Sequence, residues 1–487
     1  MQRPEPEDDS DDDDEPKIKK KPSNKLANFF GEAPPTNKKL SKFFGSPAAK
    51  EAAKLPAHLR QEYKPNELMF NMEGKVKGGT IQALVERLTQ HDVVDTEFLN
   101  AFLLTYKSFS TGQVLLELVI KRFTVTPPPG LTPEQEGEFN EKKLTPIRLR
   151  VINVLKTWIE TYYDDFSEGH MLKTASGFIN GEMKTHLKAP SEQLQKLIQK
   201  KTAGTVSRKV GVSGQAPLPI VSKSLSAAKI KFVDLDPLEI ARQLTIMEST
   251  IFNSINASEF LGKAWSTTAA DTLSPHIRQL IERANKVTAF VVEAIVQEET
   301  PKKRLELIKH FILISEKCLV LNNFNTLMAI LAGLSSAPIH RLKRTWAPLT
   351  SKLKLELESL RKTMDHASNF AVYRDTLHSV NPPCVPFLGV YLTDLTFIED
   401  GNPDLIKGTS LINFDKRMKV SAVLQEIQRY QTTQYCLQPV PVIENYFAER
   451  FKAVQSIDQL YELSLKREPR ESNDETVLRL LTESGLY

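Results

Sequence analysis

Cysteine is scarce in this sequence, and long hydrophobic runs are missing. The 487 residues include three cysteines, Cys318, Cys384 and Cys436, which are too few and too scattered for a disulfide framework or a zinc site. We therefore expect reduced thiols that pack as small apolar side chains. No segment approaches the roughly 18 continuous apolar residues of a membrane-spanning helix, and the acidic N-terminus differs from a signal peptide. The sequence predicts a cytoplasmic protein.

Motifs of covalent catalysis are missing as well. The sequence has no GxxxxGKS/T phosphate loop, no HExxH zinc motif and no GxSxG nucleophile turn. Its nine histidines are dispersed, so we predict neither a metal site nor a cofactor. These absences fit a protein that acts on a partner by binding it rather than by making and breaking bonds.

Charge is distributed unevenly along the chain. The net charge is +4, but residues 1–15 hold nine acidic side chains and one arginine, which leaves +12 on the remainder. A moderately basic body favours an acidic protein surface or an anionic membrane as its partner. Because the cations are not concentrated, the sequence does not indicate nucleic-acid binding, and we predict no nucleic acid partner.

The first 60 residues are predicted to form a disordered tail, because they are charged, contain prolines and have few branched apolar residues. The motif Leu-x-x-Phe-Phe-Gly occurs twice in this tail, from Leu26 to Phe30 and from Leu40 to Phe44, each followed by the glycine. Each copy places three apolar side chains on one face of a helical turn. It could therefore dock into a groove of this protein's own folded body or of a partner, and the sequence leaves both alternatives open.

Helical periodicity divides the remainder into two parts. Apolar residues recur three and four positions apart, as at Ile81, Leu84 and Leu88, whereas strand-like alternation is rare. The predicted fold class is therefore all-α, and a segment rich in serine, lysine and proline separates the two parts. The predicted units are the tail (1–60), a small helical domain (66–187), a linker (188–230) and a large helical domain (231–487).

The most informative segment is NPPCVPFLGVYLTDLTFIEDGNPD, residues 381–404. Prolines at its start oppose a helix, and the run from Phe387 to Leu392 is too apolar for an exposed loop. Glu399 and Asp400 then add negative charge before a Gly-Asn-Pro turn. An apolar run that leads into an acidic turn favours a segment that pushes on a bound partner.

This segment and four further blocks resemble the catalytic domain of Ras guanine nucleotide exchange factors of the Son-of-sevenless type. The blocks are DLDPLEIARQLT, ASEFLGKAW, LVLNNFNTLMAILAGLSSAPIHRL and LINFDKRMKVSAVLQEIQRYQ. In the smaller domain, GGTIQALVERLT and DTEFLNAFLLTYKSF are similar to the Ras-exchanger-motif domain, which braces the catalytic hairpin in this family. The resemblance covers residues 66–470 and implies an all-α fold with a protruding helical hairpin.

The resemblance also implies a binding site for a Ras-family small GTPase. Its hairpin would open the nucleotide site of the GTPase, with Thr396 near the magnesium ion of the GTPase and Asp400 near the α-phosphate. A fixed negative charge at that place disfavours bound nucleotide and can accept hydrogen bonds from the amides that held the phosphate. The positions that would grip the GTPase are Ile281, Asn285, Met328, Ser335, Phe370 and Phe387.

The implied activity is promotion of GDP release and GTP loading in Ras-family signalling, without covalent chemistry. Exchange factor and nucleotide would each weaken the binding of the other, with Ras favoured as the partner and Rap as the other candidate. No lipid-attachment signal is present, so we expect partners to recruit the protein to the cytoplasmic face of membranes.

Two alternatives stay open. The first is a non-catalytic GTPase-binding scaffold, favoured by Thr396 and Ser335, where Son-of-sevenless proteins carry leucine and many family members carry asparagine. The second is a helical interaction protein that binds partners through the repeated tail motif.

Overall fold

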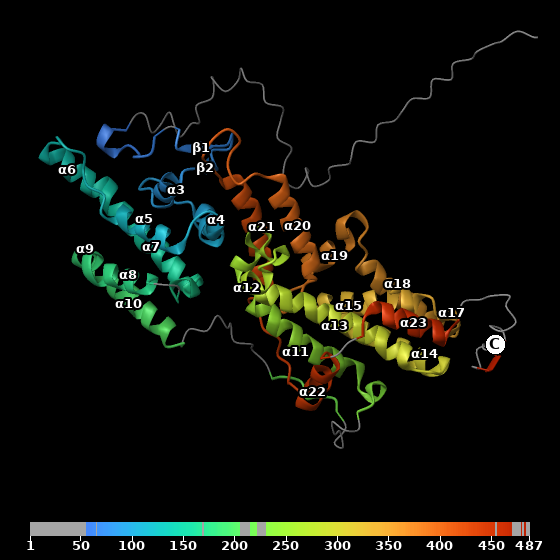
Figure 1. Ribbon diagram of the computed structural model, residues 1–487. Coiled ribbons are helices and arrows are strands. Elements are labelled where there is room, and N and C mark those ends of the chain that lie inside the picture. The colour runs from blue at the N-terminus through green and yellow to red at the C-terminus, as the bar shows by residue number, and fades with distance from the viewer. Residues whose placement is uncertain are drawn as a thin grey trace, which may run out of the picture. The chain divides into compact units, whose positions relative to one another are not determined.

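The computed structural model of the protein is mostly helical and has one small sheet (Figure 1). The predicted all-α fold class is therefore confirmed. Both copies of the tail motif lie outside the described residues. The structure describes residues 55–64, 66–167, 170–204, 215–221, 230–452, 455–469, 479 and 482–483.

The N-terminal domain is a helical unit with two short strands, and several of its helices begin at capping residues. The side chains of Thr80, Asp95 and Thr111 each accept a hydrogen bond from a backbone N–H in the first turn of the helix that follows. The elements are η1 (Ala57–Leu59), β1 (Leu68–Phe70), β2 (Val76–Gly79), α3 (Ile81–Leu88), α4 (Thr96–Thr105), η2 (Tyr106–Ser108), α5 (Gly112–Phe123), α6 (Pro133–Phe139), η3 (Asn140–Leu144), α7 (Thr145–Thr161), η4 (Tyr163–Ser167), α8 (Met171–Phe178), η5 (Ile179–Met183), α9 (Lys184–His186) and α10 (Lys188–Thr202).

A buried carboxylate connects three elements of this domain. Asp165 on η4 accepts hydrogen bonds from the Tyr106 hydroxyl at 2.7 Å and from the Trp158 indole N–H at 2.8 Å. Lys107 lies 2.8 Å from its other oxygen. Because a buried carboxylate is stable only when its oxygens are paired, Asp165 fixes η2, α7 and η4 relative to one another.

Helix α10 occupies the first part of the segment predicted to be the linker. Leu194 is buried in the core of the N-terminal domain, and the Ser191 hydroxyl donates to the Ile179 carbonyl at 2.6 Å. The sequence of α10, KAPSEQLQKLIQKKT, is polar except for one apolar stripe. Its composition therefore resembles a linker, although its spacing is that of an amphipathic helix.

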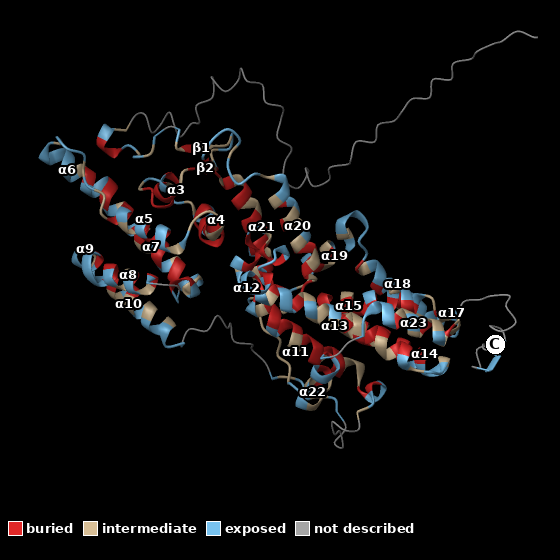
Figure 2. Ribbon diagram, viewed as in Figure 1, coloured by how far each residue is buried: buried red, intermediate tan, exposed pale blue. Residues whose placement is uncertain are grey.

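The C-terminal domain is built on helices α11, α13, α14 and α15, which pack against one another through their buried residues (Figure 2). A Cβ on Gly333 of α15 would lie 2.8 Å from Val291 of α13, so glycine permits this close crossing. The elements are η7 (Phe232–Asp234), α11 (Pro237–Ser254), η8 (Ala257–Ser266), α12 (Ala270–Leu273), α13 (Pro275–Gln297), α14 (Pro301–Val320), α15 (Phe324–Ser335), α16 (Ala337–His340), α17 (Lys343–Trp346), α18 (Ser351–Thr363), α19 (Ala367–Ser379), α20 (Leu388–Gly401), β3 (Ile412–Asn413), α21 (Phe414–Tyr430), α22 (Pro441–Arg450) and α23 (Ile457–Arg467).

The core of this domain holds an ionisable group, Glu248 of α11. One carboxylate oxygen accepts a hydrogen bond from Asn325 of α15 at 2.6 Å, and the other has no hydrogen-bond partner among the described residues. Burial raises the pKa of Glu248 to about 7, because the Asn325 hydrogen bond and the charge of Arg283 offset the loss of hydration only in part.

Helices α20 and α21 form a hairpin whose connecting segment reaches the N-terminal domain (Figure 1). Strand β3 pairs antiparallel with β2, with Gly78 opposite Asn413, and gives the sheet order β1-β2-β3. A Cβ on Gly78 would lie 2.3 Å from the Ile412 carbonyl oxygen, so this pairing requires glycine. The next residue, Phe414, is fully buried, with its ring 4.6 Å from that of Phe98 and 6.2 Å from that of Phe102.

Replacing Phe414 with alanine should remove this aromatic contact between the domains. We expect the free energy of unfolding to fall by about 3–5 kcal/mol, as for other buried phenylalanines, in a urea titration followed by fluorescence. Phe397→Ala is the matched control, because Phe397 is 59% exposed on the same hairpin and should change stability by less than about 0.5 kcal/mol. Equal losses in the two variants would contradict the assigned packing.

Glu248 should make stability depend on pH. Its pKa rises from 4.5 to about 7 on folding. Its contribution to the free energy of unfolding is therefore fully present below pH 4.5 and is lost as the pH rises through 7. Glu248→Gln, which stays neutral, should be up to about 3 kcal/mol more stable than the wild type at pH 8 and nearly equal to it at pH 4.5. Thermal unfolding at both pH values measures this.

A second buried carboxylate on α11 supplies the control for that experiment. Glu239 accepts hydrogen bonds from Gln243 at 2.7 Å, Ile220 at 2.9 Å and Arg242 at 3.1 Å. Because both of its oxygens are paired, Glu239→Gln should lower the melting temperature at pH 8. A gain in that variant, or no gain in Glu248→Gln, would contradict the role given to the unpaired oxygen.

Candidate functional site

An aromatic cluster lies where α19 meets the start of α20. The ring centroids of Phe370 and Phe387 are 5.8 Å apart, and the backbone N–H of Phe387 donates to the Tyr373 hydroxyl at 2.8 Å. Tyr373 also packs against Phe324, the first residue of α15, with centroids 5.3 Å apart. Two of the predicted site residues, Phe370 and Phe387, are therefore in contact and rest on a buried tyrosine.

Backbone strain coincides with this cluster. Ser368, Asn369 and Phe370 have φ angles of 52°, 58° and 59°, a left-handed conformation that is unfavourable for residues other than glycine. Arg374 stabilises this turn by donating to the Asn369 carbonyl at 2.9 Å and to both carboxylate oxygens of Asp394 on α20 at 2.8 and 2.9 Å. The strained turn thus fixes the position of the Phe370 ring against α20.

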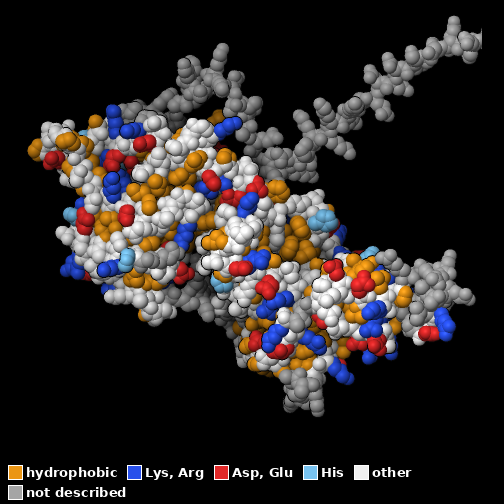
Figure 3. All heavy atoms as spheres, in the orientation of Figure 1, with side chains coloured by type: hydrophobic (Ala, Val, Ile, Leu, Met, Phe, Trp, Pro, Cys, Tyr) orange, Lys and Arg blue, Asp and Glu red, His pale blue; other side chains and the backbone are white. Residues whose placement is uncertain are grey.

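Four more predicted site residues lie on α13 and α15, which are in contact. Ile281 and Met328 are half-buried and pack against the domain core, whereas Asn285 and Ser335 are exposed. Met328 follows Phe324 by one helical turn, so it lies on the side of α15 that faces the aromatic cluster. We define the apolar patch as Ile281, Met328, Phe370 and Phe387; Figure 3 shows hydrophobic side chains gathered on the surface over α19.

The other two predicted residues lie near the far end of α20. Thr396 donates its hydroxyl to the Leu392 carbonyl at 2.7 Å, within its own helix. Asp400 is exposed, in the last turn of α20, and forms an ion pair with Lys263 of η8. At about 1.5 Å per residue, the thirteen positions between Phe387 and Asp400 place the two ends roughly 20 Å apart, so the structure separates the apolar patch from the charged end.

Two other carboxylates beside Asp400 are neutralised within the hairpin. Lys416 of α21 contacts both Glu399 and Asp404, and Arg417 lies 2.8 Å from Asp404. Partial burial tends to raise the pKa of Asp404, but hydrogen bonds from Lys416 and Arg417 outweigh it and keep that pKa below its usual range. These acids therefore hold α20 against α21.

Sequence reasoning did not identify three residues that position the site: Tyr373, Arg374 and Lys263. Tyr373 packs against Phe370 and Phe387, and Arg374 donates a hydrogen bond to the strained turn. Lys263 is 137 residues away from Asp400 along the chain. Such a contact leaves no local pattern in the sequence.

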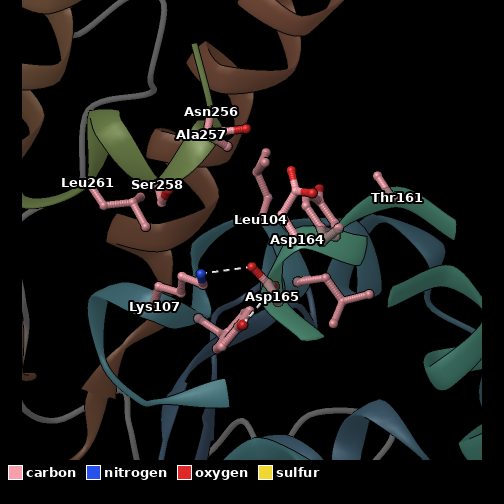
Figure 4. A pocket seen from close by; sticks show the side chains of 12 residues that line it. Leu104, Lys107, Thr161, Asp164, Asp165, Asn256, Ala257, Ser258 and Leu261 are labelled. Carbon is pink, nitrogen blue, oxygen red and sulfur yellow. Dashed lines mark hydrogen bonds and ion pairs between the residues drawn. The ribbon is translucent and has the colours of Figure 1, made fainter. Parts of the chain in front are cut away.

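Element η8 also lies against the N-terminal domain. A cavity of about 140 Å³ is lined by Ser258 and Leu261 of η8 on one side and by Leu104, Lys107 and Asp165 on the other (Figure 4). The element that carries Lys263 is therefore in contact with both domains.

The described part of the chain holds no group of three or more histidine, cysteine, aspartate or glutamate side chains placed to bind a metal ion. In the same residues, every helix is too short or too polar to span a bilayer.

Two family models match this chain. The RasGEF domain matches residues 239–418, and the RasGEF N-terminal motif matches residues 75–178. All eight predicted site residues fall within the first match, and strand β2 and helix α4, which contact β3 and α21 of the hairpin, fall within the second.

Several known proteins are similar over most of this chain. Ras guanine nucleotide exchange factor A of Dictyostelium discoideum is 34% identical over 434 residues, which cover 86% of this chain and 70% of that protein. Cell division control protein 25 of Candida albicans is 36% identical over 421 residues, 83% of this chain and 31% of that protein. Protein son of sevenless of Drosophila melanogaster is 32% identical over 429 residues, which cover 81% of this chain and 27% of that protein.

The chain thus spans about a third of the length of the last two relatives. It spans more than two thirds of the Dictyostelium protein, and both parts of the expected domain pair are matched in the expected order. This chain belongs to the family of Ras guanine nucleotide exchange factors.

Proposed function

We propose that this protein is a guanine nucleotide exchange factor that binds a Ras-family small GTPase and promotes release of its GDP. The observation that carries the proposal is the arrangement of α20, with the half-buried apolar patch at its N-cap, Phe387, and an exposed carboxylate, Asp400, in its last turn. Such a helix can hold a partner at one end and act on that partner's nucleotide site with the other.

The apolar patch supplies binding energy. Its four side chains are half-buried, so they still expose apolar surface that a partner can cover, and aromatic anchors contribute much of the affinity of protein interfaces. Asn285 and Ser335 are exposed on the same two helices as Ile281 and Met328, where they supply a polar rim. The strained turn at Phe370 and the Tyr373 hydroxyl keep the two rings in place before the GTPase arrives.

The charged end of α20 would weaken binding of the nucleotide to the GTPase. A carboxylate inserted beside the phosphates repels them, and it can take over hydrogen bonds from the backbone amides that bound phosphate. Thr396 is a short side chain whose hydroxyl is engaged within the helix, so Asp400 carries this step. Nucleotide and exchange factor then weaken each other's binding by the same factor, and no covalent step is required.

Ras is the partner we propose first, because the names of several similar proteins include Ras. We assign the exchange domain to residues 231–487 and the bracing domain to residues 66–187, extended by α10. The two family matches lie within these limits. Recruitment to the cytoplasmic face of a membrane through a partner stays a prediction of the sequence.

A non-catalytic scaffold is the second candidate, because Thr396 is short and engaged and Asp400 is already paired with Lys263. A pull-down that compares nucleotide-free Ras with GDP-loaded Ras separates the two functions. An exchange factor prefers the nucleotide-free form, whereas a scaffold shows no such preference.

Asp400→Ala tests the charged end. Wild-type protein in catalytic amounts should accelerate release of fluorescent GDP from Ras in the presence of excess unlabelled nucleotide, and the variant should be slower by about tenfold or more, the effect of removing a positioned charge. Glu449→Gln, which removes an exposed carboxylate on α22, is the control and should match the wild type. An active wild type with an equally active Asp400→Ala variant would remove this carboxylate from the mechanism.

Phe387→Ala tests the apolar patch. Loss of an aromatic anchor should weaken binding of nucleotide-free Ras by about tenfold or more, measured by titration against immobilised GTPase. Tyr446→Ala is the matched control, because Tyr446 of α22 is another half-buried aromatic that packs on the same core. Circular dichroism verifies that both variants fold, and unchanged affinity in a folded Phe387→Ala variant would exclude this patch as the binding surface.

A further inference from the structure

Lys263 and Asp400 form a contact between the hairpin and the rest of the exchange domain. Lys263 belongs to η8, and Asp400 is in the last turn of α20. Their side chains are 33% and 59% exposed. The pair is therefore open to solvent, and a partner that approaches the end of α20 meets both residues.

Asp400 differs from its acidic neighbours in how it is paired. Glu399 and Asp404 are held by Lys416 and Arg417, whose side chains are only 3% and 2% exposed and come from the hairpin itself. The partner of Asp400 comes from outside the hairpin through an exposed contact. Because exposed ion pairs are weak, Asp400 is the acid of this group that can change partners without disrupting the hairpin.

Lys263 projects from a rigid support. Gly262 and Lys263 have φ angles of 59° and 55°, so the lysine sits in a left-handed turn that surrounding contacts must maintain. Buried Glu259 of the same element accepts hydrogen bonds from the backbone N–H groups of His276, at 2.8 Å, and Ile277, at 3.2 Å. These bonds fix η8 to the first turn of α13, so Lys263 restrains α20 relative to the body of the domain.

The charge of Lys263 acts in two ways. It compensates a carboxylate at the C-terminal end of a helix, where the helix dipole disfavours negative charge. It also lowers the negative charge that Asp400 presents to a nucleotide. The same contact therefore stabilises the free hairpin and weakens its action on phosphate.

We propose that Lys263 is a latch on the hairpin, which holds Asp400 in the free protein and releases it when a GTPase binds. The inference rests on the proposed function, in which Asp400 acts at the nucleotide site. On binding, the backbone amides that held the nucleotide phosphate replace the Lys263 ammonium as the partner of the carboxylate. Lys263 thus restrains the exchange reaction through Asp400.

The first test uses the protein alone. In Lys263→Met, the side chain keeps its approximate length and loses its charge, so amide hydrogen exchange in residues 396–404 should accelerate relative to the wild type. Lys263→Arg retains the ion pair and should match the wild type. Lys452→Met, which breaks an exposed ion pair at the C-terminal end of α22, should leave these amides unchanged. If Lys263→Met also leaves them unchanged, no latch exists, whatever the activity of the protein.

The second test measures release of fluorescent GDP from Ras. Lys263→Met should exchange faster than the wild type by about 1.5- to 5-fold, the factor that an exposed ion pair provides. This increase in exchange rate should be smaller at 1 M salt, where exposed charges are screened. In the Asp400→Asn background, adding Lys263→Met should not change the rate. A slower Lys263→Met variant, or a gain that persists in the Asp400→Asn background, would overturn the latch.

The two tests separate the latch from the proposed function. If the wild type does not accelerate GDP release from Ras or Rap, the proposed function fails and the regulatory role of Lys263 fails with it, even where hydrogen exchange shows that the ion pair holds the hairpin. If the wild type is active and Lys263→Met shows neither effect, the latch alone is wrong.

Discussion

The contact on which the hairpin depends is the packing of Phe414 against Phe98 and Phe102 of the N-terminal domain. Phe414 is the first residue of α21, so its burial fixes where that helix begins. The preceding two residues form β3 and complete the sheet with β2, which orients the connection as well. A hairpin anchored at its connection by an aromatic core and a strand pairing can act as a rigid lever, because its two helices cannot swing independently.

The second constraint is that the two ends of α20 lie in different surroundings. Its first turn packs beside the strained segment at Ser368, Asn369 and Phe370, and in its last turn the exposed side chain of Asp400 lies beside η8. Strain of this kind is maintained only where surrounding contacts support it, and here the Arg374 pair with Asp394 supplies that support. The domain therefore stores conformational energy near the surface that a partner would cover, while the charged end is left adjustable.

Much of the fold follows from sequence patterns. The helical spacing of Ile81, Leu84 and Leu88 corresponds to α3, which begins after its cap Thr80. The sequence did not predict helix α10, because its composition is polar and only Leu194 and a few other apolar residues mark its buried face. Strand β3 could not be foreseen, because two residues carry no periodicity and the pairing partner lies more than 300 residues earlier.

The candidate site divides in the same way. The resemblance supplied the positions of Phe370 and Phe387, and the structure brings them to 5.8 Å. It could not supply Lys263 or Tyr373, because their importance arises from contacts between distant elements. Local sequence reports what a residue can do, whereas the neighbours that restrain it are set by the packing of the whole domain.

The strand pairing at Gly78 makes the two domains depend on each other. A chain with only the exchange domain would expose Phe414 and an unpaired strand edge, the features that chaperones bind and from which aggregates grow. A chain with only the N-terminal domain would expose the faces of Phe98 and Phe102 that Phe414 covers. A gene rearrangement that separated the two segments would therefore expose these surfaces in both products, although each half has its own hydrophobic core.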